Sequence, residues 1–366
     1  MLTHRLPHSA KPHSRILPQR GIDMAKAGFV TIIGKPNVGK STLMNTLIGQ
    51  KLAITSYRPQ TTRKQMRTVY TDERGQIVFL DTPGMLRGGS EDLTARDAAR
   101  LSDGTPSKLP PSFAKGAGIS DLCRTKLGGY MELAAESTLK EADLILLLVE
   151  AGNGAIIRPQ DQAVLDLLKS PEAGIHTPVF LVINKVDAVK KTRILEYIET
   201  YRKAFPFREI IPVSARTGKG RDELLSAIFQ ILPEGEPFYD EDTVTDEKER
   251  DIVAEIIREK TLRLLQDEVP HGIAVIVDSM KYREGRSGTI CDISASIITE
   301  KDSHKGIIIG RNGEMLKKIG TAARTDIENL IDTHVNLKLW VKVRKDWRDK
   351  ESDLSAYGYR FKDLKN

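Results

Sequence analysis

Residues 34–42 read Gly-Lys-Pro-Asn-Val-Gly-Lys-Ser-Thr, which is the complete G-x-x-x-x-G-K-[ST] pattern of a Walker A loop. An apolar run at 29–33 precedes the stretch, and apolar residues at helical spacing follow it from Leu43. The pattern indicates phosphate binding when it lies between a strand and a helix, as it does here. The backbone N–H groups of such a loop point inward around the phosphates, at the positive end of the helix. The sequence therefore predicts a nucleotide-binding protein.

Two side chains of this loop have roles that follow from their chemistry. Lys40 is expected to reach the β- and γ-phosphates, and the Ser41 hydroxyl is expected to coordinate Mg²⁺. The backbone supplies the remaining contacts, so the whole loop is predicted to line the nucleotide. Its residues are Gly34, Lys35, Pro36, Asn37, Val38, Gly39, Lys40, Ser41 and Thr42.

The composition is that of a globular protein. The chain has 366 residues, of which 40% are hydrophobic and 29% charged, and this length suits two domains. The longest continuous apolar run, 144–149, is far shorter than the roughly 20 residues that a membrane span needs. Cys123 and Cys291 lie too far apart for a zinc pattern, which favours a reducing compartment. The net charge of +6 favours an anionic partner.

Apolar runs alternate with helical patterns through the first two thirds of the chain. Strands buried on both faces are predicted at 76–80, 144–149, 179–183 and 210–213, and helices at 130–141, 160–169, 191–203 and 221–232. This order predicts an α/β fold with a doubly wound, mostly parallel sheet, the P-loop NTPase G domain. Its ligands belong at the carboxyl ends of the strands.

The rest of the chain divides by composition. The predicted segments are a basic, disordered N-terminal extension at 1–26, a G domain at 27–232 with a surface insertion at 86–126, an acidic Pro/Gly linker at 233–245 and a second domain at 246–366. Residues 1–23 are either an upstream extension, a start assigned too early, or an organellar transit peptide, whose basic, acid-poor composition they share.

A second motif, Asp81-Thr82-Pro83-Gly84, directly follows a predicted strand. A carboxylate at this strand end suits an Mg²⁺ site opposite Ser41, usually with a water molecule as the link. Gly84 can bring its N–H to the γ-phosphate because it has no side chain. Alone the tetrapeptide would be a turn, but after a Walker A loop it indicates part of the nucleotide site.

A third motif, Asn184-Lys185-Val186-Asp187, closes the strand at 179–183. Guanine presents two adjacent donors, N1–H and the exocyclic amine, and one carboxylate accepts both, whereas adenine lacks this pattern. Asp187 is the predicted acceptor. Asn184 is expected to tie this loop to the phosphate loop, and the Lys185 stem is expected to lie over the base.

The base pocket is expected to be completed by the backbone of Ser214-Ala215-Arg216, which follows the strand at 210–213. Alone this tripeptide carries little information. Together with Asp187 it favours GTP and GDP, with Mg²⁺, over adenine nucleotides.

Residues Gln60-Thr61-Thr62-Arg63 lie between the first helix and the next strand. A threonine hydroxyl there can complete the Mg²⁺ shell while γ-phosphate is present and release it after hydrolysis. Thr62 is the favoured metal ligand, with Ser41 and Asp81, and Thr61 is the alternative. A threonine-rich loop without a metal role also fits so short a motif.

Many switch GTPases place a glutamine after Asp-x-x-Gly to orient the attacking water, but this chain has Met85. Asn37 in the phosphate loop could hold a monovalent cation against the phosphates. Our hypothesis is slow intrinsic hydrolysis in which K⁺ supplies part of the missing charge stabilisation. The predicted catalytic residues are Lys40, Asn37, Thr62 and Gly84.

The second domain is predicted to have a long helix at about 246–267, strands at 272–279 and 289–299, two short helices around 310–313 and a last strand at 335–343. This order is that of a small α+β KH domain of the second type. Gly310-Arg311-Asn312-Gly313 forms the G-x-x-G turn with which such domains clamp about four single-stranded nucleotides. Lys317 and Lys318 follow on the next helix, where they can meet phosphate.

These motifs together resemble the Era GTPases of ribosome assembly, over about 27–85 and 127–360. The resemblance implies GTP hydrolysis coupled to binding the 3′ end of small-subunit (16S-type) ribosomal RNA, which assists maturation of the 30S-type subunit. It further implies a cytoplasmic protein that can contact the inner membrane peripherally. The protein is expected to be a monomer without a transmembrane segment. The insertion at 86–126 departs from the family, in which a short loop is usual.

Two other classes remain open. A regulatory GTPase would act through a protein partner and use the small domain as an adaptor. A non-hydrolysing RNA-binding module would bind GTP without turnover. A protein with tandem G domains is disfavoured because only one Walker A loop occurs, and an ATPase is disfavoured by Asp187.

Overall fold

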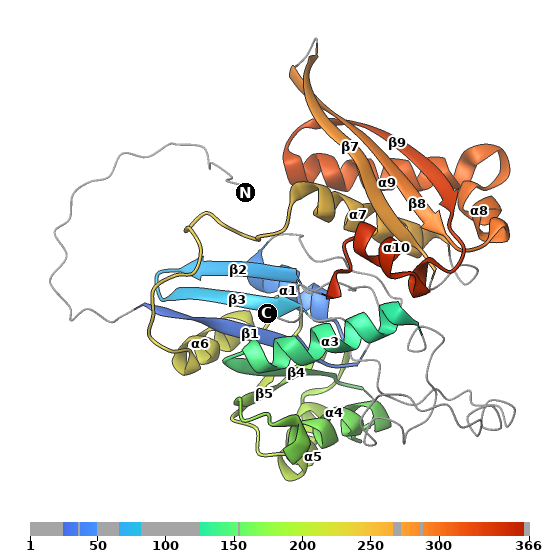
Figure 1. The fold of residues 1–366 in the computed structure, drawn as a ribbon. Helices are drawn as coiled ribbons and strands as arrows, with labels where there is room; N and C mark the ends of the chain where they lie inside the picture. Colours follow the sequence, from blue (N-terminus) through green and yellow to red (C-terminus); the bar gives the residue numbers. More distant parts are fainter. Residues whose placement is uncertain are drawn as a thin grey trace, which may run out of the picture.

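The computed structural model describes residues 25–35, 37–49, 66–81, 125–152, 154–265, 272–285 and 288–361. Two separate sheets organise them (Figure 1), a six-stranded one followed along the chain by a three-stranded one. The elements of the N-terminal domain are β1 (Lys26–Ile33), α1 (Lys40–Ile48), β2 (Met66–Asp72), β3 (Gly75–Asp81), α3 (Lys126–Glu141), β4 (Leu144–Glu150), α4 (Pro159–Lys169), β5 (Val179–Asn184), α5 (Lys191–Ala204), β6 (Glu209–Pro212) and α6 (Arg221–Ile231).

The six-stranded sheet has the order β2-β3-β1-β4-β5-β6. All neighbouring pairs are parallel except β2 with β3, which is antiparallel. Every residue of β3 and β5 is buried, because helices cover both faces of the sheet. The predicted doubly wound fold is therefore confirmed, and β3, β4 and β5 are buried as expected. β6 is not buried on both faces, because it is an edge strand in which Ile211 is the one buried residue. β2 is the other edge strand, and the apolar runs did not reveal it.

Helices pack on both faces of this sheet (Figure 1). One hydrophobic cluster joins α1 and α6 to the strands, and a second joins α4, α5 and the end of α3 to the opposite face. The phosphate loop lies at the carboxyl end of β1 and the 184–187 loop at that of β5. The parallel register therefore brings the two loops to one edge of the sheet.

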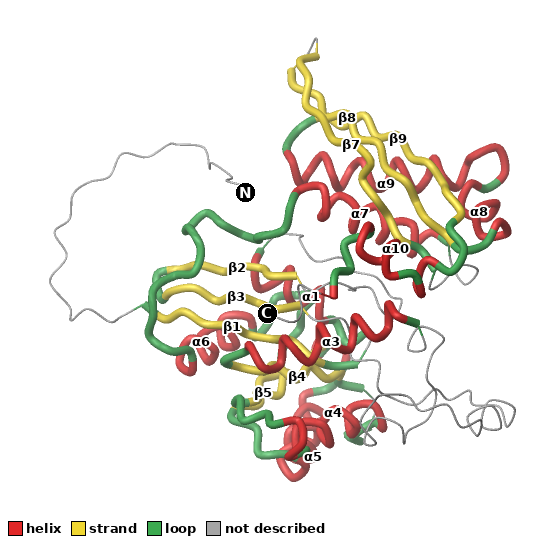
Figure 2. Tube along the Cα trace, in the orientation of Figure 1, coloured by secondary structure: helices red, strands yellow, loops and turns green. Residues whose placement is uncertain are grey.

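The segment at 233–245 contains no helix or strand, and it lies along the N-terminal domain. Figure 2 shows it as loop that passes β2 and continues to α7 (Glu249–Leu264). The buried Gln76 side chain accepts hydrogen bonds from the N–H groups of Phe238 and Tyr239 and donates one to the Tyr239 carbonyl. The Val69 N–H donates to the Val244 carbonyl. The linker is thus held by the domain that it leaves.

The three-stranded sheet belongs to the C-terminal domain. Its elements are α7, β7 (Ala274–Gly285), β8 (Gly288–Thr299), α8 (Asp302–Ile309), the 3₁₀ turn η5 (Arg311–Gly313), α9 (Glu314–Ile331), β9 (His334–Val343), the 3₁₀ turn η6 (Trp347–Asp349) and α10 (Glu351–Ala356). β8 is antiparallel to β7 and parallel to β9, and α7 and α9 cover one face. The predicted KH order is confirmed, although α9 is a helix of 18 residues rather than a short one.

A further apolar cluster, the domain contact, joins the two domains. It contains Leu127, Tyr130 and Met131 of α3 together with residues of the C-terminal domain, including Trp347, Leu354 and Tyr359. The Tyr130 ring lies edge-on to that of Tyr359, with centroids 5.7 Å apart. The Lys126 N–H at the start of α3 donates to Asp349. One end of α3 therefore packs under the last described segment of the chain.

Candidate nucleotide-binding site and nucleic-acid turn

The phosphate loop joins β1 to α1, and two of its glycines are required by close packing. A Cβ on Gly34 would lie 2.4 Å from the Leu148 carbonyl oxygen, and a Cβ on Gly39 would lie 2.4 Å from Asn184 Nδ2. Gly39 also has a left-handed φ of 101°, which favours glycine. In the described part of the chain, no side chain caps the N-terminus of α1. The first amides of this helix can therefore donate to a phosphate.

Lys40 is the first residue of α1, and its ammonium turns back over the loop. It donates to the carbonyl oxygens of Gly34 at 2.9 Å and Lys35 at 3.1 Å. Burial lowers the pKa of Lys40 to about 8, and the nearby charge of Asp81 opposes this shift. Asp81 ends β3 with a side chain only 2% exposed. The Ser41 hydroxyl and the Asp81 carboxylate are the hard oxygen donors that Mg²⁺ prefers, so the residues present fit this ion.

The loop at 184–187 is hydrogen-bonded to the phosphate loop at two points. Asn184 donates from Nδ2 to the Val38 carbonyl at 2.7 Å and accepts the Ala215 N–H at Oδ1, at 2.9 Å. Lys185 donates to the Asn37 carbonyl at 3.0 Å, and the buried Val186 follows it in the same loop. The three loops therefore form one connected unit, with Asn184 at its centre.

Asp187 presents its carboxylate at the end of this unit, held by two side chains. The Ser214 hydroxyl donates to Oδ1 and the Arg216 guanidinium donates to Oδ2, each at 2.6 Å. The bond from Ser214 is the main cause of a lowered Asp187 pKa, to which Arg216 also contributes. Asp187 is thus ionised at neutral pH and can accept two N–H groups from a base. The side-chain contact of Arg216 was not foreseen, since that residue was expected to act through its backbone.

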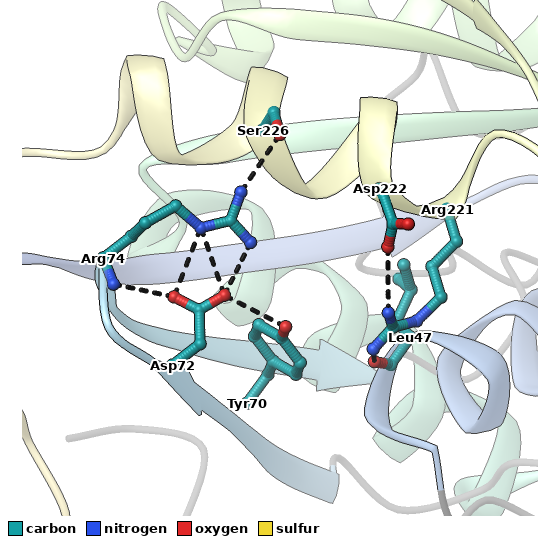
Figure 3. A network of polar contacts seen from close by, with 7 residues as sticks. All are labelled: Leu47, Tyr70, Asp72, Arg74, Arg221, Asp222 and Ser226. Carbon is teal, nitrogen blue, oxygen red and sulfur yellow. Dashed lines mark hydrogen bonds and ion pairs between the residues drawn. The ribbon is translucent and has the colours of Figure 1, made fainter.

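The loop at 214–216 is also anchored to α1. The Thr46 hydroxyl donates to the Ala215 carbonyl at 2.5 Å. Arg221, at the start of α6, donates to the Thr46 carbonyl near the end of α1. It also donates to the Leu47 carbonyl, beside which it lies in Figure 3. Arg221 therefore satisfies acceptors that the helix leaves open. Sequence reasoning missed Thr46 and Arg221, because neither belongs to a recognisable motif.

Figure 3 also shows how the β2–β3 hairpin is attached to α6. Arg74 bonds the Asp72 carboxylate on one side and the Ser226 hydroxyl on the other. Tyr70 donates to the same carboxylate at 3.0 Å. These contacts stabilise the edge of the sheet rather than the nucleotide loops.

Several predicted site residues lie outside the described residues. They are Pro36, Thr61, Thr62, Thr82, Pro83 and Gly84, and Met85 lies there too. Most of the predicted insertion, 86–124, is also outside, whereas Thr125 caps α3 and Lys126 begins it. Of the predicted metal ligands, the structure places Ser41 and Asp81 at the same edge of the sheet.

The G-x-x-G turn lies between α8 and α9 in the C-terminal domain. Gly310, Asn312 and Gly313 all have positive φ angles, of 73°, 52° and 80°. A Cβ on Gly310 would lie 2.7 Å from that of Met315, whereas one on Gly313 would meet open space. Arg311 and Asn312 are exposed, as are Lys317 and Lys318 one turn into α9. The turn therefore offers bare backbone beside two cations.

Comparison with known proteins identifies both domains. A family described as "50S ribosome-binding GTPase" matches residues 29–185, and a KH-domain family matches residues 268–348. GTPase Era of Ruminiclostridium cellulolyticum is 46% identical over 337 residues, which cover 92% of this chain and 98% of that protein. GTPase Era of Geobacter metallireducens is 45% identical, with 91% and 98% covered. The chain belongs to the Era GTPase family.

Solved structures of Era share this fold across both domains. Era with MgGDPNP and nucleotides 1506–1542 of 16S ribosomal RNA has a TM-score of 0.75 and 37% identity, over 92% of this chain and all of that one. A tyrosine-to-alanine variant of Aquifex aeolicus Era, bound to GDP·AlF4⁻, has a TM-score of 0.76 and 36% identity, with the same shares covered. Membership of the Era family confirms the predicted fold class and makes this chain a GTPase.

Proposed function

We propose that this chain hydrolyses GTP and couples its nucleotide state to binding of small-subunit ribosomal RNA, which assists maturation and assembly of that subunit. The observation that carries the proposal is the combination, in one chain, of an Asp187-based base pocket with a G-x-x-G turn. The related structure that holds MgGDPNP together with a 16S fragment supports this combination.

At the nucleotide site, the chain's own groups do the binding. The amides of the loop and of the α1 N-terminus receive the phosphates, and Lys40 transfers its hydrogen bonds from the carbonyls of Gly34 and Lys35 to phosphate oxygens. Mg²⁺, when bound, neutralises charge that develops on the phosphates, and Ser41 and Asp81 would hold it. Asp187 selects guanine by accepting its two adjacent donors.

Hydrolysis is proposed to depend on Asn37, Thr62 and Gly84 in addition to Lys40. Asn37 is exposed, and its backbone carbonyl accepts a hydrogen bond from the Lys185 ammonium. We propose that the side-chain amide oxygen helps hold K⁺ beside the phosphates, in partial compensation for Met85. Thr62 is the proposed third metal ligand, and Gly84 the proposed γ-phosphate donor.

At the RNA site, backbone conformation does most of the binding. The glycines of the turn let single-stranded RNA approach the main chain, while Lys317 and Lys318 meet its phosphates. The proposed ligand is the 3′ region of small-subunit RNA. A regulatory GTPase that uses its C-terminal domain as a protein adaptor is the alternative, and it predicts that substitutions at Gly310 and Gly313 leave RNA affinity unchanged.

The proposed location is the cytoplasm, with the protein as a monomer. None of the helices in the described ranges is long and apolar enough to cross a membrane. Peripheral contact with the inner membrane rests on the family resemblance alone. An organellar location is the alternative, and it depends on residues 1–23, which lie outside the described residues.

The deciding experiment is GTP turnover with and without a 3′ fragment of small-subunit RNA, together with filter binding of that fragment. We expect binding and faster turnover with the fragment than with a scrambled RNA of equal length. If the fragment neither binds nor stimulates turnover, the ribosomal function is contradicted, and the GTPase assignment stays intact. No turnover under any condition, including K⁺, would favour a non-hydrolysing RNA-binding module.

A further inference from the structure

The C-terminal sheet has one face covered by helices and another that is largely open. Alternate residues of β7, β8 and β9 pack against α7 and α9 in the core of the domain. On the other face, Ala274 and Ile298 belong to the domain contact. Figure 1 shows α9 behind the strands and α10 near their lower end. The open face consists of the residues of 278–283, 292–296 and 338–342 that point away from α7 and α9.

Trp340 is the large apolar side chain of the open face, and 59% of its surface is exposed. In the register of the sheet it pairs with Ser296, so a small side chain lies beside it on β8. The other tryptophan, Trp347, is fully buried and stacks on Tyr359. Within the described ranges, the Trp340 ring contacts no other ring and no cation. It therefore offers a flat apolar surface on which another ring can stack.

Cations surround this indole on the open face. Lys338 and Lys342 flank Trp340 at alternate positions of β9, and alternate side chains of a strand share a face. β7 adds Lys281 and Arg283, which are exposed at alternate positions of that strand. Among the residues that the structure describes, Lys281 and Lys338 take part in no ion pair. Both are free to meet an anionic ligand.

The two acids of the open face are already engaged. Asp278 accepts the Ser296 hydroxyl at 2.6 Å and pairs with Lys342 at 3.5 Å. Asp292 accepts a hydrogen bond from the Arg283 guanidinium at 2.5 Å. The acids thus balance two of the four cations, and the open face keeps a net positive charge beside an exposed aromatic ring.

This chemistry matches a single strand of nucleic acid. Bases stack on exposed aromatic side chains, and lysines beside them meet the phosphates that join the bases. The position of β9 also suits such a ligand, because β9 is an edge strand of the sheet and packs against both α8 and α9, which flank the G-x-x-G turn. A strand that leaves the turn can therefore pass around β9 to the open face.

We propose that the open face is a second RNA-binding surface, on which Trp340 stacks a base and Lys338 contacts a phosphate of the strand held at the turn. The inference rests on the proposed function, since the turn must first hold that strand. It lengthens the RNA site beyond the roughly four nucleotides that a G-x-x-G turn clamps.

Trp340→Ala tests the stack with strands of two lengths, both from the 3′ region of small-subunit RNA and both measured by fluorescence anisotropy. Affinity for a strand of about 12 nucleotides should fall about tenfold, and affinity for one of about four should stay within about twofold. Trp340→Phe keeps a ring and should recover most of the loss. Tyr282→Ala is the matched control and should change neither affinity, because Tyr282 is an exposed aromatic that pairs with Cys291 of the helix-covered face. An unchanged affinity of Trp340→Ala for the longer strand would overturn the proposal.

Tryptophan fluorescence provides a measurement on the unmodified chain, so it does not depend on the folding of a variant. A base stacked on Trp340 quenches its emission, whereas Trp347 is buried away from solvent. With the bound nucleotide held constant, we expect the longer strand to quench the emission of the unmodified chain. Trp340→Phe, in which Trp347 is the remaining tryptophan, should show no quenching. Binding of the longer strand without quenching would contradict the stack.

Salt dependence tests the lysine. Lys338→Ala should reduce the slope of log affinity against log salt by about 0.7 for the longer strand, as expected for one phosphate contact with a single strand. An unchanged slope would contradict the contact.

Vesicles of phosphatidylglycerol and phosphatidylcholine separate RNA from an anionic lipid surface, which basic and aromatic side chains also suit. Loss of vesicle binding by Trp340→Ala, with RNA affinity unchanged, would overturn the proposal in favour of a membrane contact. If neither strand binds the unmodified protein, the proposed RNA function fails and this inference with it. Binding of the longer strand that is insensitive to Trp340→Ala contradicts the inference alone.

Discussion

The nucleotide site and the G-x-x-G turn solve different recognition problems by different means. The nucleotide loops are joined by hydrogen bonds through buried side chains, above all Asn184, which contacts two other loops at once. The turn at 310–313 is defined by backbone angles, and its two central side chains are exposed. A rigid base and phosphates require fixed partners, whereas a flexible strand of RNA requires room and cations. The two sites should therefore fail under different substitutions.

The largest effect is expected at Asp187. Asp187→Asn replaces an acceptor of two N–H groups by an amide that donates one, so GDP affinity should fall about a hundredfold. Xanthine offers a carbonyl where guanine has its amine, and xanthosine diphosphate should bind the variant better than GDP. Competition binding with both nucleotides measures the change. Unchanged preference for GDP would show that guanine is read elsewhere.

Asn184→Ala tests whether the nucleotide site depends on its internal connections. The substitution leaves the Val38 carbonyl and the Ala215 N–H without their hydrogen-bond partner. Each buried group left unpaired lowers the free energy of unfolding by about 1–3 kcal/mol. We expect GDP affinity to fall about thirtyfold, since part of that cost appears in binding, and the thermal midpoint to fall as well. Isothermal titration and thermal unfolding measure the two effects. A change in stability without a change in affinity would separate Asn184 from nucleotide binding.

Gly310→Asp tests the G-x-x-G turn, the site that is defined by backbone angles rather than by side-chain hydrogen bonds. The new side chain meets Met315, requires an unfavourable φ and brings a negative charge to RNA, so RNA affinity should fall at least about tenfold. GTP turnover without RNA should stay unchanged. Gly313→Asp, which meets no neighbour, should cost less RNA affinity than Gly310→Asp. If both variants bind RNA normally, the turn is not the RNA site.

Turnover in K⁺ compared with Na⁺ tests the proposed role of Asn37. We expect GTP hydrolysis to be severalfold faster in K⁺ than in Na⁺, which corresponds to an activation free energy that is lower by about 1 kcal/mol. Asn37→Asp should change this K⁺ effect, whereas GDP binding should change little. Equal rates in the two salts, or a K⁺ effect untouched by Asn37→Asp, would contradict the hypothesis.

The smallest effect is expected at Arg216. Its guanidinium is largely exposed, and an exposed ion pair contributes about 0–1 kcal/mol. Arg216→Ala should therefore change GDP affinity less than about fivefold, because Ser214 still holds the carboxylate. Competition binding of nucleotides measures the GDP affinity of Arg216→Ala, which is then compared with that of Asp187→Asn. A loss as large as that of Asp187→Asn would mean that Arg216 itself is central to base recognition.

The sequence predicted the fold well where burial was continuous. The apolar runs corresponding to β3, β4 and β5 needed no further context, because strands covered on both faces have no polar side. The edge strand β2 (Met66–Asp72) mixes polar and apolar residues, so it contains no continuous apolar run. The linker at 233–245 was predicted from its Pro/Gly content, but the attachment of this segment through Gln76 depends on a contact between distant residues.

The candidate site shows the same division. Each motif is local, since a loop that binds phosphate or guanine carries its chemistry within a few consecutive residues. The residues that hold the loops together do not form motifs. Thr46 and Arg221 act across separations in sequence that only the folded sheet removes. Supporting residues of this kind become visible in the structure, not in one sequence.

The domain contact has a consequence for synthesis of the protein. Ribosomes synthesise a chain from its N-terminus. Leu127, Tyr130 and Met131 therefore leave the ribosome long before Trp347 and Tyr359. The N-terminal domain can complete its own sheet during that interval, but this end of α3 still lacks its aromatic partners. The docked arrangement of the two domains is therefore restricted to chains that have been translated through Tyr359.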